Sequence, residues 1–135
     1  MRTVSATRWI GEPPATVLDA LDPMAIIDAE GTFSALDVEE TDEETRVFAR
    51  GGGMEVVFAF TRTEAGYEYE QLGEAGPFET MESTLGVTPD DEGALVAMES
   101  AVSLGLPFAS VTDRIAAWKR RGELQRALRT IEERV

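Results

Sequence analysis

The sequence predicts an α+β protein in which a curved antiparallel sheet wraps around one long helix. Six runs with the alternating pattern of half-buried strands lie between residues 33 and 104. A pair of short helical segments precedes them, and one long amphipathic segment follows them to the C-terminus. This order leaves room for a hollow between the sheet and the long helix, so a cavity-bearing binding protein is expected.

The N-terminal segment is expected to form one strand and two short helices. Residues 2–10 are rich in Thr, Val and Trp, which is typical of a strand. Pro13 and Pro14 suit the start of a helix, because proline at the first helical position loses no needed N–H group. Asp22 can cap a second short helix, and Gly31 is expected to end it.

Six further strands complete an expected sheet of seven. In the run from Met54 to Thr61, for example, the alternation places Met54, Val56, Phe58 and Phe60 on one face. Glycine-containing or acidic turns separate the runs, and the Gly51–Gly53 triplet is a hairpin turn because no phosphate-loop sequence follows it. The six expected strands are residues 33–39, 45–50, 54–61, 67–72, 78–87 and 94–104.

A single long helix is expected over residues 108–134. It is predicted to face inward along one apolar stripe, which is made of a series before Gly122 and a second series after it. All elements are expected to form one domain, residues 1–135, since the chain is too short for two. The stripe consists of Phe108, Val111, Ile115, Trp118, Leu124, Leu128, Ile131 and Val135.

Two segments carry a resemblance to a known family. WIGEPPATVLDALDP (residues 9–23) combines a strand end, a proline turn and a Val-x-x-x-Leu helix ending at Asp-Pro, and SLGLPFASVTDRIAAWKRRGELQRAL (residues 103–128) resembles a closing helix. The chain resembles the START-like (SRPBCC) superfamily, in particular its polyketide cyclase and lipid-transport branch. The resemblance implies a helix-grip fold, with an apolar cavity between the sheet and the long helix. It implies no particular reaction, because one fold hosts many functions.

The charge is strongly negative and unevenly distributed. The net charge is −14, with −17 over residues 1–112 and +3 over residues 113–135. Such a surface repels itself unless concentrated salt shortens the screening length, and it suggests a halophilic protein. The acid excess argues against binding nucleic acid or inserting into an anionic membrane. With no long apolar run or signal peptide, a cytoplasmic location is expected.

Several kinds of catalytic and metal site are excluded by composition. The chain has no cysteine and no histidine, so thiolate nucleophiles, Ser-His-Asp triads and zinc-thiolate sites cannot form. The acidic stretch from Asp37 to Thr45 lacks the glycine and closing glutamate of an EF-hand loop, and is expected to be a solvated hairpin. No catalytic residue, metal or cofactor is therefore predicted.

The candidate ligand-binding residues are those assigned to the inward face. Methionine and aromatic side chains suit an adaptable pocket for a flat, apolar ligand. Two alternatives stay open, a small pocket and a core that these side chains simply fill. The candidates are Met54, Phe58, Phe60, Tyr67, Tyr69, Met81, Met98, Ile115 and Trp118.

Charged and polar residues near these strands have simpler interpretations. Glu82 and Glu99 alternate out of phase with the methionine face, so they are expected to point to water rather than act as acids or bases. Tyr67 and Tyr69 either donate hydrogen bonds to a ligand or pack as ordinary strand residues. The basic triplet 119–121 is expected to be a solvated face that pairs with acids elsewhere.

Three functions are compatible with these patterns. The favoured one is binding or transport of a small hydrophobic ligand, such as a lipid, isoprenoid, quinone or polyketide-like molecule, in the internal cavity. The alternatives are a cyclase-like or hydrolase-like enzyme that uses Glu or Tyr in the cavity, and a non-catalytic accessory module with a filled core. An enzyme is the less expected outcome, because no catalytic set is present. The protein partner, if one exists, is not indicated by the sequence.

Overall fold

The computed structural model describes residues 2–73, 78–105 and 109–135. Seven strands and three helices occur in these ranges, in the order that the sequence predicts. The elements are β1 (Arg2–Ile10), α1 (Pro14–Asp19), α2 (Pro23–Glu30), β2 (Ser34–Glu40), β3 (Thr45–Gly51), β4 (Met54–Arg62), β5 (Gly66–Leu72), β6 (Thr80–Asp90), β7 (Gly93–Ser103) and α3 (Ala109–Arg134).

All seven strands belong to one antiparallel sheet, in the order β1-β7-β6-β5-β4-β3-β2. Consecutive strands from β2 to β7 are neighbours, and β1 closes the far edge by pairing with β7. The predicted antiparallel sheet is therefore confirmed. Strand limits differ from the expected ones by a few residues; β6, for instance, begins at Thr80 rather than at Phe78.

Both short helices begin where the sequence indicates, and α2 also ends at the expected residue, Gly31. Asp22 accepts a hydrogen bond from the backbone N–H of Ala25 at 2.8 Å and so caps α2. Gly31 ends α2 with φ +83°, a conformation that glycine adopts without the penalty other residues incur. A Cβ at Gly31 would also meet the side chain of Arg126 at 2.6 Å, so α2 and α3 approach closely here.

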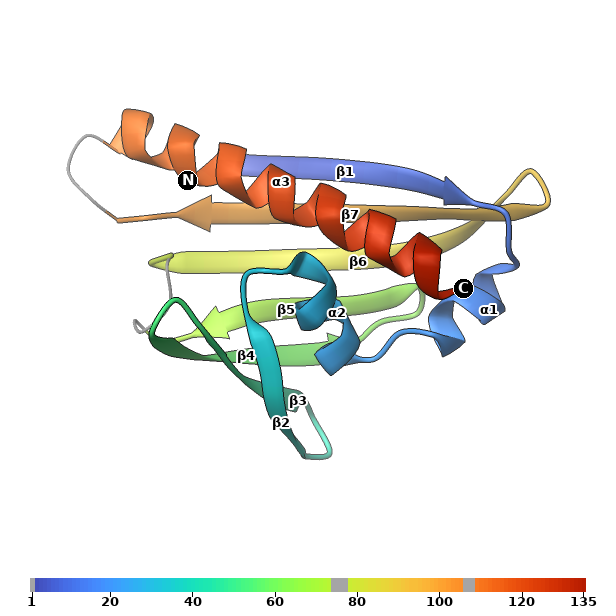
Figure 1. Cartoon of the computed structure of the whole chain (residues 1–135), viewed down its shortest axis with the longest axis horizontal. Coiled ribbons are helices and arrows are strands. Elements are labelled where there is room, and N and C mark those ends of the chain that lie inside the picture. The colour runs from blue at the N-terminus through green and yellow to red at the C-terminus, as the bar shows by residue number, and fades with distance from the viewer. Residues whose placement is uncertain (1, 74–77, 106–108) are drawn as a thin grey trace.

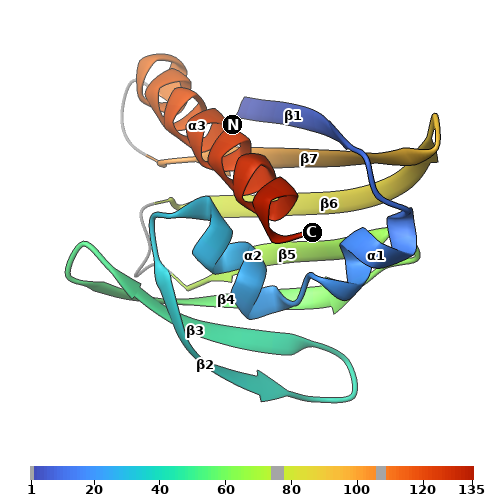
Figure 2. The same ribbon diagram turned by 45° about the vertical axis from the view of Figure 1, so that its right-hand side comes forward.

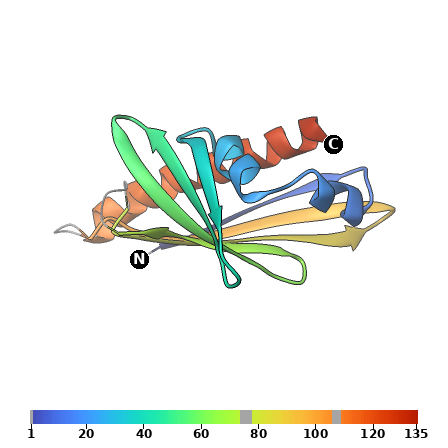
Figure 3. The ribbon, with the colours of Figure 1, turned by 90° about the horizontal axis from the view of Figure 1, so that it is seen from below.

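All three helices lie on the same side of the sheet. Helix α3 crosses β1, β7 and β6, while α1 and α2 cover the neighbouring part of that side (Figures 1 and 2). Seen from below, the sheet bends so that β2 and β3 rise toward the helices (Figure 3). The sheet is therefore concave on the side that carries α3, as the helix-grip fold requires. No described helix is long and apolar enough to cross a membrane.

One apolar cluster lies between the sheet and the helices. Residues from the concave face of β4, β5, β6 and β7 meet residues from α2 and the C-terminal half of α3. Phe108, the first residue of the predicted stripe and of the predicted long helix, lies outside the described residues. Large members of the cluster include Ile10, Ile26, Ile27, Phe60, Met81, Leu85, Met98, Leu124, Leu128 and Ile131.

Candidate functional site

Three hydroxyl groups form a row across the middle of the concave face. Tyr69 on β5 pairs with Ser83 on β6, and Ser83 pairs with Ser100 on β7. Since cross-strand partners point to the same face of a sheet, all three side chains face α3. All three are buried, and the Oγ atoms of Ser83 and Ser100 lie 2.7 Å apart.

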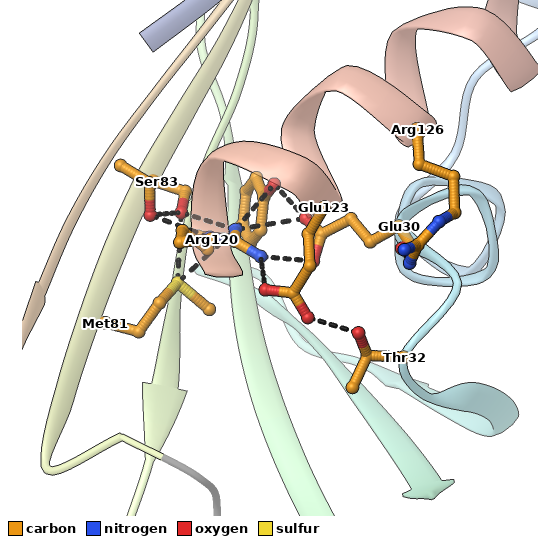
Figure 4. Close-up of polar contacts among 9 residues, drawn as sticks. Glu30, Thr32, Met81, Ser83, Arg120, Glu123 and Arg126 are labelled. Atoms are coloured by element: carbon orange, nitrogen blue, oxygen red, sulfur yellow. Dashed lines mark hydrogen bonds and ion pairs between the residues drawn. The ribbon is translucent and has the colours of Figure 1, made fainter. Parts of the chain in front are cut away.

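Arg120 extends from α3 into the interior and donates to this row (Figure 4). Its Nε donates to Ser100 Oγ at 2.9 Å, and its Nη2 donates to Ser83 Oγ at 2.8 Å. The same Nη2 lies 3.4 Å from the hydroxyl of Tyr69. Arginine carries five N–H donors in a planar fork, so one side chain can bond to three strands.

Two carboxylates complete the cluster from the opposite side. Glu30, the last residue of α2, accepts from Nη1 of Arg120 at 2.6 Å and from Nη2 at 3.1 Å. Glu123, on the next turn of α3, accepts from Nη1 at 3.3 Å and from the hydroxyl of Thr32. Arg126 donates to the backbone carbonyl of Glu30 at 2.7 Å. Buried charges need this degree of pairing, because an unpaired buried ion is strongly destabilising.

The cluster keeps Arg120 charged and Tyr69 protonated. Burial lowers the pKa of Arg120, but the Glu30 carboxylate and the Tyr69 oxygen outweigh burial, and the pKa is raised overall. Burial raises the pKa of Tyr69 well above its usual value, and the neighbouring Glu30 carboxylate adds to the rise. At neutral pH, Arg120 is therefore a hydrogen-bond donor, and Tyr69 is a phenol that donates rather than a base.

Aromatic and sulfur-containing side chains border this polar cluster. The rings of Phe60 and Tyr69 stack with centroids 4.5 Å apart and an interplanar angle of 6°. The Met81 sulfur accepts from Ser83 Oγ at 3.0 Å and lies 3.7 Å from Nη2 of Arg120. Because the N–H donors of Arg120 all have partners within the cluster, an oxygen atom of a bound molecule can reach Arg120 only by replacing one of these partners. Among the described residues, no group of three acidic side chains is placed to hold a metal ion.

Comparison with known proteins gives matches in structure only. No family model matches the chain. No curated protein matches it either. Among solved structures, TTHA0849 from Thermus thermophilus is similar with a TM-score of 0.77 and 21% identity, covering 98% of this chain and 96% of that one. A START superfamily protein from Mycobacterium smegmatis is similar with a TM-score of 0.74 and 15% identity, over 98% and 96% of the two chains. The chain has the START-like fold.

A third solved structure widens the range of proteins that share this fold. The Zhui aromatase/cyclase from a Streptomyces species is similar with a TM-score of 0.61 and 15% identity, over 98% of this chain and 94% of that one. At such identities the likeness establishes the START-like fold and leaves ligand and reaction to be argued from the residues of this chain.

Seven of the nine candidate residues lie on the concave side of this START-like sheet. Met54 is half-buried and packs against the apolar cluster, and the other six are buried. Tyr67 accepts from Nη1 of Arg62 at 3.1 Å, whereas Tyr69 joins the Arg120 cluster. Their role in ligand binding stays a prediction. The six buried candidates are Phe58, Phe60, Tyr67, Tyr69, Met81 and Met98.

The expectation that Val111, Ile115 and Trp118 face the interior is wrong, because all three are exposed. Ile115 is 61% exposed and Trp118 is 78% exposed. The error lies in the helical phase. Trp118 and Leu124 are six positions apart, which is about 600° of rotation around the helix axis. Because two full turns are 720°, the two side chains point in directions about 120° apart. The two apolar series therefore lie on different faces of α3, and only the C-terminal one is buried.

Sequence reasoning also misses Arg120, because it places the whole basic triplet on a solvated face. Lys119 and Arg121 are exposed as expected, but Arg120 is 1% exposed. The available signal is the position of Arg120 one turn before Leu124, on the face that continues the buried C-terminal series. Glu82 and Glu99 are exposed on the outer face of the sheet, as expected.

Three hollows open on the described part of the molecule. Two, of about 490 and 470 Å³, are lined by outer-face residues of the sheet such as Glu68, Thr84 and Glu99. The lining of the first also includes Tyr69, Ser83 and Ser100, and that of the second includes Tyr67 and Met98. The third, of about 400 Å³, runs where α3 meets the edge strand β1. None of these three is lined by Arg120, Glu30 or Glu123.

Proposed function

We propose that this chain binds a small, largely apolar molecule between the concave face of the sheet and α3, with the Arg120 cluster holding an oxygen atom of that molecule. The observation that carries the proposal is a charged guanidinium, almost fully buried, that lies beside aromatic and sulfur-containing side chains. Ligand sites typically combine an apolar lining with a few well-placed polar groups. This combination is what the interior of the fold offers.

Binding requires a rearrangement, because the groups of the cluster now satisfy one another. Serine hydroxyls rotate to suit their partners, and methionine side chains are flexible. A ligand oxygen can therefore replace Ser83 as an acceptor for Arg120 once the Met81 side chain turns away. Among the ligand classes named from the sequence, this geometry favours those with a carbonyl, phenol or carboxylate oxygen, such as quinones and polyketide-like molecules.

The proposed role is binding or carriage without chemistry. A cyclase-like or hydrolase-like mechanism needs a free base in the site. The two carboxylates of the Arg120 cluster, Glu30 and Glu123, accept hydrogen bonds from Arg120, and the phenol of Tyr69 stays protonated. The cluster is therefore better suited to recognising an oxygen atom than to moving a proton.

Calorimetric titration with beta-naphthol, a flat apolar probe with one oxygen, tests the proposal. Wild-type protein and Thr84→Leu, which changes the outer face of β6, are expected to give saturable binding. Ser83→Leu, one residue earlier on the concave face, is expected to weaken binding about tenfold or more, because it fills the space beside Arg120. Circular dichroism establishes that each variant is folded.

Native mass spectrometry of wild-type protein, purified gently in concentrated salt, gives a second measurement that needs no variant. An apolar molecule retained by the protein supports the proposal. A wild-type protein that neither binds the probe nor retains any apolar molecule overturns it. Equal binding by wild type and a folded Ser83→Leu variant also overturns it, since the probe would then occupy another surface.

A second candidate, a non-catalytic interaction module, is favoured by the exposed apolar stripe of α3. Val111, Ile115 and Trp118 share one face of the helix and are 58%, 61% and 78% exposed. Arg114 and Arg121 flank them, and the surface of residues 1–112 carries a net charge of −17. By charge complementarity, the proposed occupant of this stripe is the acidic surface of a second copy.

Sedimentation velocity at several protein concentrations tests this second candidate. Wild-type protein is expected to self-associate in a salt-dependent way, and Trp118→Ala is expected to abolish association. Trp9→Ala, which removes the other tryptophan, is the matched control. A wild-type protein that remains monomeric at all concentrations excludes a second copy as the occupant.

A further inference from the structure

One buried side-chain acceptor near the Arg120 cluster has no hydrogen-bond partner within the part of the chain that the structure describes. Gln71 lies on β5, on the same face as Tyr69, and is 8% exposed. Its Nε2 donates to the backbone carbonyl of Phe78 at 2.6 Å, which fixes the orientation of the amide. Among the described residues, Gln71 Oε1 is the one buried side-chain nitrogen or oxygen atom without a hydrogen-bond partner.

Such an atom calls for an explanation. Buried polar side-chain atoms are nearly always hydrogen-bonded, and a buried acceptor left without a donor destabilises the fold. The side-chain amide of Gln71 cannot rotate to exchange Oε1 and Nε2, because the backbone carbonyl of Phe78 would then face Oε1 and lose its donor. The atom that completes the bond must therefore bring an O–H or N–H group to Oε1.

The surroundings of Gln71 connect it to the proposed ligand site. Phe58 is its cross-strand partner on β4. Glu70 pairs with Glu82, which places Met81 beside Gln71 on the neighbouring strand. The sulfur of Met81 in turn contacts both Ser83 and Arg120. A molecule that extends from Arg120 across the position of Met81 therefore reaches Gln71.

We propose that Gln71 is a specificity-determining residue that accepts a hydrogen bond from a hydroxyl or N–H group of the bound molecule. The inference rests on the proposed function and narrows its ligand class. The preferred ligand carries a donor group for Gln71 on an apolar body that fits between Phe58 and Met81. Apolar molecules that offer acceptors only, such as quinones without a hydroxyl, are bound less well.

The test compares 2,6-dihydroxynaphthalene, a naphthol with one oxygen for Arg120 and a second O–H group for Gln71, with its dimethyl ether, which keeps the ring system and both oxygens but lacks the donor. Wild-type protein is expected to bind the naphthol about tenfold more tightly than the ether. Gln71→Met, which removes the acceptor, is expected to lose this preference. Glu70→Met, one residue earlier and on the outer face, is the matched control and is expected to keep it.

The outcomes separate this inference from the proposed function. If wild type binds both probes equally, or if Gln71→Met keeps the preference, the inference is wrong while ligand binding stands, and Gln71 Oε1 is satisfied by water only. If neither probe binds and the wild-type protein retains no apolar molecule, both fail. Should Gln71→Met not fold, the side-chain amide resonances of Gln71 in wild-type protein decide: they are expected to shift with the naphthol and not with the ether.

Discussion

Arg120 on α3 and Glu30 at the end of α2 form a buried two-point ion pair, with N–O distances of 2.6 and 3.1 Å. The pair joins residues that are 90 positions apart in the sequence. It also holds the long helix against the short one on the concave side of the sheet. Because neither charge reaches solvent, the stability of this contact depends on both partners being present.

Removing one partner of this pair is expected to be costly. Arg120→Met leaves the carboxylates of Glu30 and Glu123 buried without their cation, so we expect the free energy of unfolding to fall by about 3–5 kcal/mol. Arg121→Met, the exposed neighbour, is expected to change it by less than about 0.5 kcal/mol. Urea denaturation measures both. Similar losses in the two variants would contradict the buried pair.

The helical phase of α3 predicts opposite results at its two apolar series. Leu124→Ala, on the buried face, is expected to reduce the free energy of unfolding by about 2–5 kcal/mol through lost packing and a cavity. Trp118→Ala removes a larger side chain, yet is expected to change it by less than about 0.5 kcal/mol, because that side chain is exposed. Thermal and urea unfolding of the two variants check this. A larger loss at Trp118 would show that the N-terminal half of α3 faces inward.

The raised pKa of Tyr69 predicts that stability falls at high pH. The unfolded chain loses the phenolic proton near its ordinary pKa of about 10, whereas the folded protein retains it. The contribution of Tyr69 to the free energy of unfolding should therefore be constant below a pH of about 10. Above that pH it should fall by up to about 1.4 kcal/mol per pH unit. Urea unfolding of wild type and Tyr69→Phe across this range measures the difference.

The tyrosinate absorbance of a Tyr67→Phe variant checks the same group directly, because Tyr69 is then the one tyrosine left in the chain. Absorbance is expected to rise only as the protein unfolds. A rise in the folded protein near the ordinary tyrosine pKa would show that Tyr69 is not held in the buried cluster.

Cross-strand carboxylates on the outer face predict a salt-dependent stability. Glu70 and Glu82 are direct partners on β5 and β6, and both are exposed. Glu82→Gln is expected to raise the free energy of unfolding by about 0.2–1 kcal/mol at low salt, because like charges directly opposite each other repel. In about 1 M KCl, where the screening length is about 3 Å, the gain should disappear.

Glu99→Gln is the matched control, since the cross-strand partners of Glu99 are Ser5 and Thr84. It should gain less than Glu82→Gln at low salt. Wild-type protein, with its net charge of −14, is also expected to gain stability as KCl is added. Stability that is independent of salt would argue against the halophilic interpretation of the composition.

Gly122 offers a test of the helix itself. It lies inside α3, and a Cβ added there would meet no atom within 4 Å. Gly122→Ala is therefore expected to raise the free energy of unfolding by about 0.5–1 kcal/mol, because alanine loses less backbone entropy in a helix. The melting temperature measures this. A decrease would show that the helix surface at this position is occupied.

Local patterns in the sequence are sufficient to predict the order of the helices and strands. They also predict, for most strands, which residues face the helices and which face solvent. Alternation with a period of two depends on adjacent residues, so it places Tyr69, Ser83 and Ser100 on one face and Glu82 on the other. Proline, the Asp22 cap and Gly31 likewise fix helix ends through contacts a few residues apart. These predictions succeed because strand alternation and helix ends are determined by residues that are close together in the chain.

The buried face of α3 and the polar contents of the interior depend instead on contacts between distant elements. Arg120 is stable in the interior because Glu30, two strand hydroxyls and Glu123 converge on it. The spacing of one turn from Leu124 places Arg120 on the apolar face, but its charge predicts the opposite, since the default for a charge is solvent. Trp118 faces outward because the burial of Arg120 and Leu124 sets the rotation of α3 about its axis. That rotation leaves the tryptophan on an exposed face.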